Sequence, residues 1–558
     1  MEKQNRKESR LSNLPVAAVD FIRLVVKKMR YRRIVQDDVH AELAAHFEDE
    51  LKSVKTDAER EQKAEQLVNG FGDAKMLAVL LRRAKKRCRP LWRTVVARAF
   101  QTVGVLFVCL VLYIVWFLTG KPAVTTNYIA ELNNMVRPVA DESLNAAPLY
   151  DKASKVFEDL PDDVLKVLGK KYFEATEEDK RLIGKWLTDN DNVFELVVAG
   201  TKRPYYWQHY EGNEMLSVPF PYLARYRKLA YSLRWRAQLL AEKGRYEEAF
   251  RDIKTCYRFG WHVKGTKLVL IEQLMGVAIE AMVVENLRNI LSEHQIDSAA
   301  LAILQRDLEQ IVAGEDFVLN FAGEKLFVYD EIQRCFTEDR FGGGHLYLTR
   351  VGQLSSIGDE SVPSPQNIIV ESIFTPQIWP IAVKVLFFHP NKQQTRESAD
   401  RFYAYCETMA RKTPAQIRTQ GIDVGKETMS IIKGNVFLGI LAPALERAAE
   451  MGHRQRTNVE AAISILALQR YKADKGFYPD DLQQLVTSGY LRQLPFDVYS
   501  DKPLVYRKTD ESFILYSIGE NFEDDGGKPG ANSKGRPRLW DYEGDSIFWP
   551  VPKPGPNQ

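Results

Sequence analysis

Acidic and amide side chains near the carboxyl-terminal end could together bind a metal ion. Residues 519–527 form a glycine-bounded loop, and a second acidic group follows shortly before residues 547–549. The oxygen-bearing residues are Asn521, Glu523, Asp524, Asp525, Asp541, Glu543 and Asp545. Calcium takes about six to eight oxygen ligands from carboxylates and backbone carbonyls, so this composition suits a calcium ion. A solvated acidic loop would have the same composition, and both interpretations stay open.

Other carboxylates could serve as a general acid and base. The pairs Glu315–Asp316 and Asp330–Glu331 stand in a region expected to be helical, where adjacent side chains diverge. The chain contains no HExxH or GxSxG motif, which would indicate a metalloprotease or a serine hydrolase. A hydrolase of unknown substrate is therefore the less favoured function class, and we expect a protein that is not an enzyme.

One stretch is apolar enough to place the protein in a membrane. Residues 95–118 read VVARAFQTVGVLFVCLVLYIVWFL and carry no charge after Arg98. A bilayer core requires about 20 predominantly apolar residues in a helix. Tyr113 and Trp116 stand near the far end, where amphipathic rings favour the membrane interface. The sequence predicts a transmembrane helix over 95–119, with a buried core helix as the alternative.

Basic residues cluster on one side of this stretch. They are Arg82, Arg83, Lys85, Lys86, Arg87, Arg89, Arg93 and Arg98. Short basic flanks stay in the cytoplasm, so residues 1–94 should be cytoplasmic and residues 120–558 should lie across the membrane. The cluster also suits contact with anionic lipids. The formal net charge of the whole chain is only +3, which gives no reason to expect a nucleic-acid partner.

Residues 1–94 are expected to form a small helical domain. Val39, Leu43, Phe47 and Leu51 recur every four residues and give one apolar helix stripe. The segments AELAAHFEDEL at 41–51 and FGDAKMLAVLL at 71–81, with Ala64 in the charged helix between them, resemble the HAAS domain that precedes membrane segments in bacterial permease-like and regulatory proteins. The resemblance implies a module that binds a cytoplasmic regulatory partner.

Residues 120–450 are predicted to be mostly helical. The segment 229–260 resembles a tetratricopeptide (TPR) helix hairpin, with Gly244 at the tight turn, Tyr246 as the aromatic residue and Ala249 at the close approach of two helices. Such hairpins usually build binding surfaces. The aromatic-rich stretch 199–224 is expected to be a loop held by its own rings, with a groove lining as the alternative.

Residues 451–550 change to a long helix followed by short strands. ALQRYKADKGFYPDDLQQLV at 467–486, LPFDVYSDKPLVYR at 494–507 and FILYSIGENFEDDGG at 513–527 resemble the globular half of a type II secretion major pseudopilin. The resemblance implies an α+β domain with a long helix packed on a small antiparallel sheet. Residues 551–558 are proline-containing and are expected to be a loose tail.

The pseudopilin resemblance also implies a metal site. The last loop of that family often holds calcium, and carried over by position the ligands are Asp524, Asp525 and Asp545, with carbonyls near Ser517 and Gly519. The chain departs from the family because about 450 residues precede the module, with no leader directly before it. We therefore expect a pilin-type domain reused for contact or display.

Together these features predict a mainly α-helical, single-span protein of the bacterial inner membrane, with its amino terminus in the cytoplasm and its carboxyl-terminal region in the periplasm. The expected function is interaction with other envelope proteins, in association with a type II secretion or pilus-like system. The alternatives are an envelope hydrolase and a transmembrane regulator that couples outer binding to the cytoplasmic domain.

Overall fold

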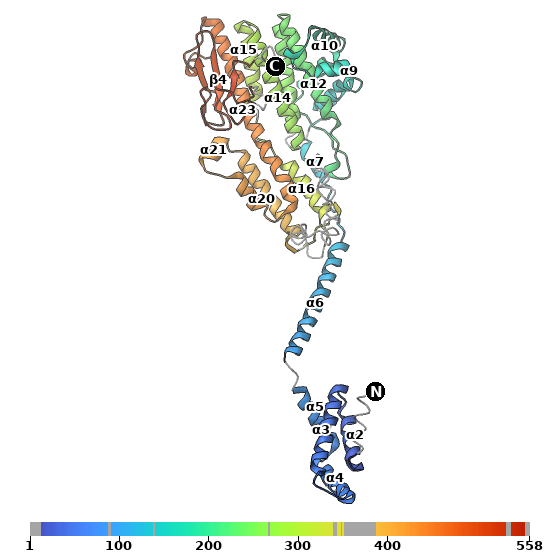
Figure 1. Ribbon diagram of the computed structural model, residues 1–558. Coiled ribbons are helices and arrows are strands. Elements are labelled where there is room, and N and C mark those ends of the chain that lie inside the picture. The colour runs from blue at the N-terminus through green and yellow to red at the C-terminus, as the bar shows by residue number, and fades with distance from the viewer. Residues whose placement is uncertain are drawn as a thin grey trace. The chain divides into compact units, whose positions relative to one another are not determined.

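The computed structural model describes residues 13–87, 91–137, 140–265, 268–338, 343–347, 349–350, 387–531 and 537–552. The chain divides into two compact units, Met1–Val115 and Trp116–Gln558. Helices dominate the described residues, and a small antiparallel sheet stands near the carboxyl-terminal end (Figure 1). The expectation of a mainly α-helical chain that ends in a small antiparallel sheet is confirmed.

Four of the described helices of the first unit pack around a core of their own. They are α2 (Val16–Met29), α3 (Arg33–Leu51), α4 (Asp57–Phe71) and α5 (Ala74–Arg87). The predicted stripe of α3 is confirmed, because Val39, Leu43, Phe47 and Leu51 are all buried. They pack with Ala18, Ile22 and Val25 of α2, Ala64 of α4, and Ala74 and Ala78 of α5. Gly72 ends α4 with φ +74°, a conformation that glycine adopts without steric cost.

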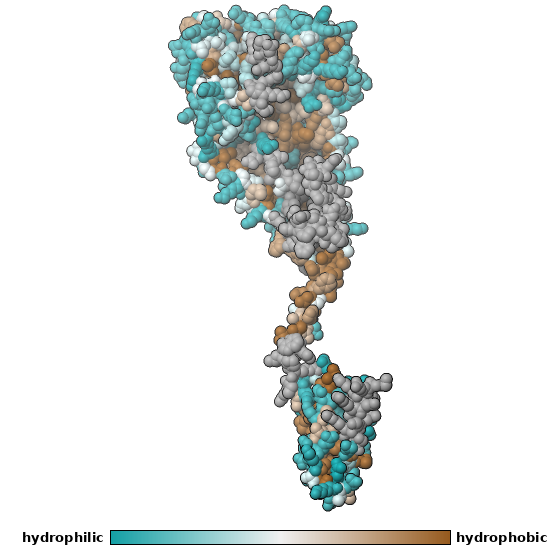
Figure 2. Space-filling model, viewed as in Figure 1, coloured by the Kyte–Doolittle hydropathy of each residue, from teal (hydrophilic) through white to brown (hydrophobic). Residues whose placement is uncertain are grey.

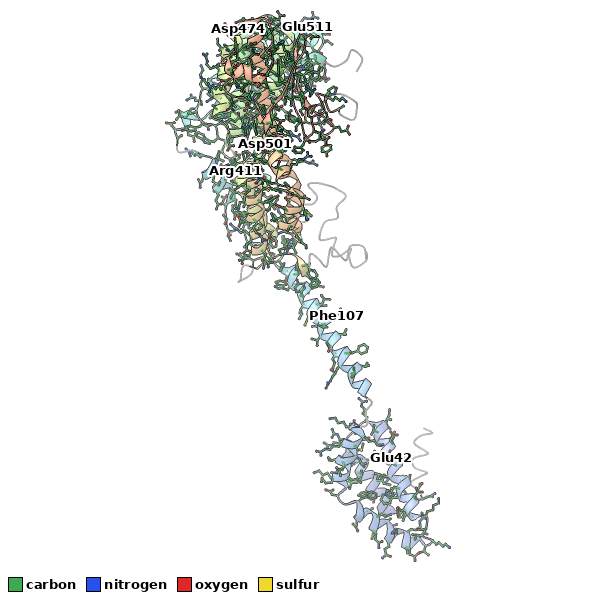
Figure 3. All side chains as sticks on the ribbon, turned by 90° about the vertical axis from the view of Figure 1, so that its left-hand side faces the viewer. Glu42, Phe107, Arg411, Asp474, Asp501 and Glu511 are labelled. Carbon is green, nitrogen blue, oxygen red and sulfur yellow. The ribbon has the colours of Figure 1, made fainter. Side chains whose placement is uncertain are left out.

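Helix α6 (Leu91–Thr119) contains the apolar stretch. Among the described residues, Val95–Thr119 is the one helical segment long and apolar enough to cross a membrane by length and composition. Its side chains project outward, as Phe107 does in Figure 3, and its surface is largely hydrophobic in Figure 2. Because only 6 % of its most apolar window is buried, it does not serve as a core helix here.

The second unit is built on a helical hairpin and the helix that covers it. Helix α12 (Pro221–Glu242) turns at Gly244, which has φ +71°, into α13 (Tyr246–Gly265), and α14 (Leu270–Glu293) packs on both. Ala249 is fully buried at the hairpin. Among the described residues, the remaining α-helices before residue 436 are α7 (Tyr128–Val136), α8 (Ala147–Ser154), α9 (Asp162–Leu168), α10 (Glu177–Asp189), α11 (Asp191–Thr201), α15 (Ser298–Ala313), α16 (Ala322–Cys335), α20 (Lys392–Ala410), α21 (Pro414–Thr419) and α22 (Val424–Ile431).

The carboxyl-terminal part consists of a long helix and short strands. Helix α23 (Val436–Lys475) packs on strands β4 (Phe513–Ser517) and β5 (Ser546–Trp549). The three-stranded sheet has the order β3-β4-β5 and is antiparallel throughout. The other elements are α24 (Leu482–Thr487), β1 (Phe496–Asp497), β2 (Lys502–Pro503) and β3 (Val505–Lys508), and β1 and β2 pair with each other. Of the expected tail 551–558, residues 553–558 lie outside the described residues.

Helix α23 is longer than the sequence predicts, and it joins two of the predicted domains. It begins at Val436 and runs uninterrupted across position 450, where the predicted boundary between residues 120–450 and 451–550 falls (Figure 1). A Cβ at Gly452 would lie 2.2 Å from the Phe317 carbonyl oxygen, so the glycine allows that close approach. One core includes residues of α12–α15 together with Leu466, Phe513 and Trp549. The carboxyl-terminal module is thus packed into the helical unit.

Candidate functional site

The acidic loop after β4, residues 519–527, is held by one buried carboxylate, that of Asp545. Asp545 is fully buried, and its Oδ1 accepts a hydrogen bond from the Asp525 N–H at 3.3 Å while its Oδ2 accepts one from the Gly527 N–H at 2.7 Å. Burial raises the pKa of Asp545, and the two backbone donors oppose that shift. Asp545 therefore fixes the backbone of the loop.

The other two predicted ligands have different partners. Asp524 is exposed; its Oδ1 accepts the Tyr516 hydroxyl at 2.7 Å, and this hydrogen bond lowers the pKa of Asp524. Asp525 accepts the side-chain amide of Asn521 at 2.7 Å. Each of the three aspartates is thus engaged by donors from a different direction.

The described side chains of the acidic loop are not gathered as a cluster of metal ligands. Across the described residues, no group of three or more His, Cys, Asp or Glu side chains is placed to hold a metal ion. Both oxygens of Asp545 already accept backbone N–H groups, so an ion bound there would share these oxygens with the two backbone donors. Calcium binding by Asp524, Asp525 and Asp545 stays a prediction from the pseudopilin resemblance.

The same loop presents an aromatic side chain. Phe522 has φ +62°, a left-handed conformation that is unfavourable for a bulky residue and is kept only where the surroundings fix it. The guanidinium of Arg418 lies 4.7 Å from the ring centre and donates to the neighbouring Asn521 carbonyl at 3.0 Å. Arg418 belongs to α21, so the loop and α21 hold each other in place.

Phe522 forms part of the wall of an apolar groove. The groove has a volume of about 400 Å³ and lies between α20, α21, α22, α23 and the acidic loop. Its lining residues are mostly apolar and come from these five elements, from Phe321 just before α16 and from Ile422 between α21 and α22. They are Phe321, Phe402, Tyr405, Cys406, Met409, Pro414, Ile417, Arg418, Ile422, Val424, Thr428, Ala449, Glu450, His453 and Phe522. Tyr405, Met409, Ile417, Ile422 and Val424 are each partly exposed. Such a concave apolar surface is typical of a binding site.

Charged groups fix the rim of the groove. Arg454 pairs with Glu450 one turn earlier at 3.1 Å and with Glu520 at the start of the acidic loop. Glu450 also accepts the Tyr499 hydroxyl at 2.9 Å. Burial lowers the pKa of His453 in the groove wall, which favours its neutral form. The groove is therefore lined mostly by apolar side chains, with the charged Arg418 and Glu450 among its lining residues.

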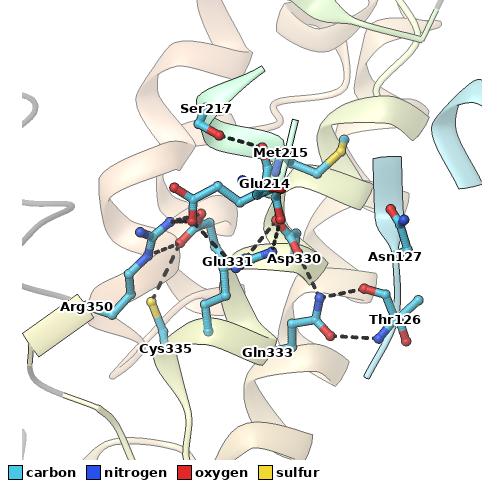
Figure 4. Close-up of polar contacts among 12 residues, drawn as sticks. Thr126, Asn127, Glu214, Met215, Ser217, Asp330, Glu331, Gln333, Cys335 and Arg350 are labelled. Carbon is cyan, nitrogen blue, oxygen red and sulfur yellow. Dashed lines mark hydrogen bonds and ion pairs between the residues drawn. The ribbon is translucent and has the colours of Figure 1, made fainter. Parts of the chain in front are cut away.

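A second polar cluster lies where the chain leaves α6 (Figure 4). The Gln333 side chain of α16 accepts the backbone N–H groups of Thr125 and Thr126 at 3.1 and 3.2 Å, and it donates to the Thr126 carbonyl at 2.9 Å. It donates also to Asp330 at 2.7 Å. The chain is thereby attached to α16 within seven residues of Thr119.

Arginines neutralise the carboxylates of this cluster. Arg350 forms two hydrogen bonds with Glu331, at 2.6 and 3.0 Å, and lies 2.8 Å from Glu214. Arg334 donates to Asp330 at 3.0 Å. Burial raises the pKa of Glu331, and the Arg350 hydrogen bond opposes that shift. The pair Asp330–Glu331, considered above as an acid and base, is therefore held by ion pairs.

The carboxyl-terminal end of α6 packs against Thr337 and His345 of the second unit. The His345 ring stacks on Phe117 at 4.7 Å between centroids and meets Trp116 edge-on at 4.4 Å. A Cβ at Gly120 would lie 2.5 Å from Thr337 Cγ2. The carboxyl-terminal end of α6 is therefore joined to the second unit through packed side chains.

The remaining residues considered for chemistry also have structural partners. Glu315 pairs with the buried Lys264, which lies 3.0 Å from Glu280, and Glu315 accepts the Tyr257 hydroxyl at 3.0 Å. Asp316 accepts the Val318 N–H at the start of a turn.

The aromatic stretch 199–224 contributes mainly to the core. Tyr206, Trp207 and Tyr210 are buried, and the Tyr210 hydroxyl donates to the buried Glu272 at 2.6 Å. The expectation of a loop held by its own rings agrees with this burial.

Sequence reasoning missed the apolar groove. Its walls come from segments up to 200 residues apart, between Phe321 and Phe522, and no local pattern brings them together. The available signal was in α20, where Tyr405 and Met409 recur one turn apart on a helix that otherwise exposes charged residues.

Comparisons with protein families, with curated proteins and with solved structures find no match for this chain. The HAAS, tetratricopeptide and pseudopilin resemblances thus stay resemblances of short motifs.

Proposed function

We propose that this chain is a single-span protein of the bacterial inner membrane that acts by binding other envelope proteins. Its binding site is the apolar groove between α20–α23 and the acidic loop. The groove carries the proposal, because its partly exposed apolar side chains are arranged as a concave surface and such surfaces usually contact a partner.

Placement in the membrane is supported by α6 and its flanks. The stretch Val95–Thr119 is outward-facing and apolar, and basic residues precede it. With the basic side in the cytoplasm, residues 1–94 are cytoplasmic and residues 120–558 are periplasmic. The groove then faces envelope proteins.

The groove suits an apolar segment of a protein partner. Its volume of about 400 Å³ accommodates a few large side chains, and its lining includes Met409, whose flexible thioether adapts to different shapes. The pilin-type resemblance of 451–550 supports a partner from a type II secretion or pilus-like system. In this proposal calcium is a structural ion of the acidic loop, which carries Phe522 into the groove wall.

Site-specific photo-crosslinking in the native membrane tests this function. A benzoylphenylalanine residue at Met409 or Ile417 of the full chain should give one discrete protein adduct, whereas the same residue at Lys166, exposed on α9, should not. The purified partner should then bind the full chain at least about tenfold more weakly after Ile417→Arg, because a charge would be desolvated in the groove. Equal adducts from Lys166, or unchanged binding by the Ile417→Arg variant, would contradict the proposal.

A second function is favoured by the junction after α6. If α6 were only an anchor, a loose connection would suffice. Here Phe117 stacks on His345 and Thr126 is attached to Gln333. Such an attachment transmits a tilt or rotation of the outer unit to α6. The chain would then act as a transmembrane regulator that couples partner binding outside to a cytoplasmic regulatory partner of the HAAS-like unit.

No observation of this kind favours the envelope hydrolase. The four carboxylates considered for it are engaged by Lys264, Arg334, Arg350 and a backbone N–H. The two interaction functions therefore account best for the described residues.

A further inference from the structure

Helix α5 has an outer face, on the side away from the core of its unit, that no other described helix of the unit covers. Ala74 and Ala78 point into the core of the first unit, and Leu77 and Leu81 pack beside them. On the opposite side, Met76 is 64 % exposed, Leu80 57 % and Val79 41 %. A small helical unit does not need to expose three neighbouring large apolar side chains, so this face requires a partner.

The charges on this outer face indicate what the partner is. Arg82, Arg83 and Lys86 are exposed, and the helical repeat places Arg83 on the Met76–Leu80 side and Lys86 next to Val79. The 14 residues of α5 include no acidic residue. Lys85 is paired with Glu42 at 2.6 Å and lies away from this face. The outer face is therefore apolar in its first half and basic in its second half.

The position of α5 in the chain determines which surface it can reach. Helix α5 ends at Arg87 and α6 begins at Leu91, so the two ends are at most about 14 Å apart even with the connection fully extended. Once α6 spans the bilayer, the basic half of α5 must stay near the cytoplasmic headgroups. Amphipathic helices with basic and apolar side chains on one face lie in that interface.

We propose that the Met76–Lys86 face of α5 docks on the anionic cytoplasmic leaflet. Met76, Val79 and Leu80 enter the headgroup region, and Arg82, Arg83 and Lys86 bind lipid phosphates. The first unit is thereby held in a fixed orientation on the membrane when the bilayer is anionic. This goes beyond partner binding by the outer unit, and it rests on the proposed insertion of α6.

An environment-sensitive fluorophore on α5 of the full chain tests the docking. The other reactive cysteines are replaced by serine, and NBD is attached at Met76→Cys. The chain is reconstituted in nanodiscs of phosphatidylcholine with or without about 30 % phosphatidylglycerol, which supplies the anionic headgroups. The matched control is NBD at Glu65→Cys, exposed on α4. Retention in the discs after alkaline washing checks the insertion of α6 separately.

We expect a blue-shifted, several-fold brighter emission at position 76 only in anionic discs. Replacing Arg82, Arg83 and Lys86 by glutamine should remove the increase, because each basic side chain strengthens such a contact about fivefold, and added salt should weaken it. Emission at position 76 that equals the control in both lipids would overturn the proposal. Emission that is bright in both lipids and depends on the number of chains per disc would also overturn it, because a second copy would then cover the face.

Discussion

Gln333 forms hydrogen bonds in both directions with the backbone of Thr126: its Oε1 accepts the N–H at 3.2 Å, and its Nε2 donates to the carbonyl oxygen at 2.9 Å. This pairing replaces the ladder that a neighbouring strand would supply. It satisfies the backbone N–H and carbonyl groups of Thr126, for which the neighbouring residues in sequence supply no partner. The Gln333 side chain thus orients the segment that connects α6 to the rest of the second unit.

Gln333→Ala should release this connection. We expect the Thr125 and Thr126 amides to exchange with solvent about fivefold faster, since each lost hydrogen bond costs about 1 kcal/mol. Hydrogen exchange followed by mass spectrometry measures the effect. Gln393→Ala on the exposed face of α20 should leave these amides unchanged. Continued protection in the Gln333→Ala variant would mean that another contact holds the segment.

Gly120→Val should destabilise the second unit, Trp116–Gln558. The added side chain would collide with Thr337, and overpacking of a close contact typically costs about 1–3 kcal/mol. Thermal melting followed by tryptophan fluorescence should show a melting temperature lower by a few degrees. Gly104→Ala is the matched control, because no heavy atom lies within 4 Å of its added Cβ. An unchanged melting temperature for Gly120→Val would show that the junction is not packed.

Asp545→Ala should cost about 1–3 kcal/mol of unfolding free energy, because it leaves the Asp525 and Gly527 N–H groups without their acceptor. Denaturant unfolding measures the change. Glu543→Ala, in an exposed position two residues earlier, should lie within about 0.5 kcal/mol of the parent chain. Equal effects of the two substitutions would argue against the role of Asp545 in holding the loop.

Calcium titration tests whether the acidic loop also binds a cation. The pseudopilin resemblance predicts a saturable rise in the melting temperature of the full chain that chelator reverses. Asp524→Asn with Asp525→Asn should abolish that rise without removing the Asp545 hydrogen bonds. A melting temperature that does not respond to calcium would show that Asp545 only fixes the loop and would remove calcium from the proposed function.

His262 should make the folding stability of the second unit sensitive to acid. Burial, with a smaller effect of Arg258, lowers the pKa of His262 to about 3. The unfolded chain has a histidine pKa of about 6.5, so below that pH it binds a proton that the folded chain does not. Stability should therefore fall as the pH falls from about 6.5 towards the folded pKa, by up to about 1.4 kcal/mol per pH unit.

Denaturant midpoints between pH 7 and pH 4 measure this dependence. His262→Gln should flatten the slope, although it lowers stability at neutral pH through loss of the Tyr150 hydrogen bond. His209→Gln, in an exposed position, should retain the slope of the parent chain. A slope that persists in His262→Gln would assign the acid sensitivity to other groups.

Local features of this chain follow from its sequence alone. The apolar stretch Val95–Thr119 and the α3 stripe are visible as hydrophobic patterns, and the turn at Gly244 as a glycine between two helical segments. The small antiparallel sheet follows from short alternating strands. These features depend on neighbours within a few residues, and periodicity records such neighbours directly.

Only the tertiary structure decided where the candidate site lies. The groove requires Met409, Ile417 and Phe522 from separate segments. The path of the chain after α6 depends on hydrogen bonds to Gln333, 207 residues beyond Thr126. The sequence placed Asp524, Asp525 and Asp545 in one acidic group, but the fold directs them to different donors. Side-chain direction and long-range contacts arise from packing of the whole unit, which no local spacing encodes.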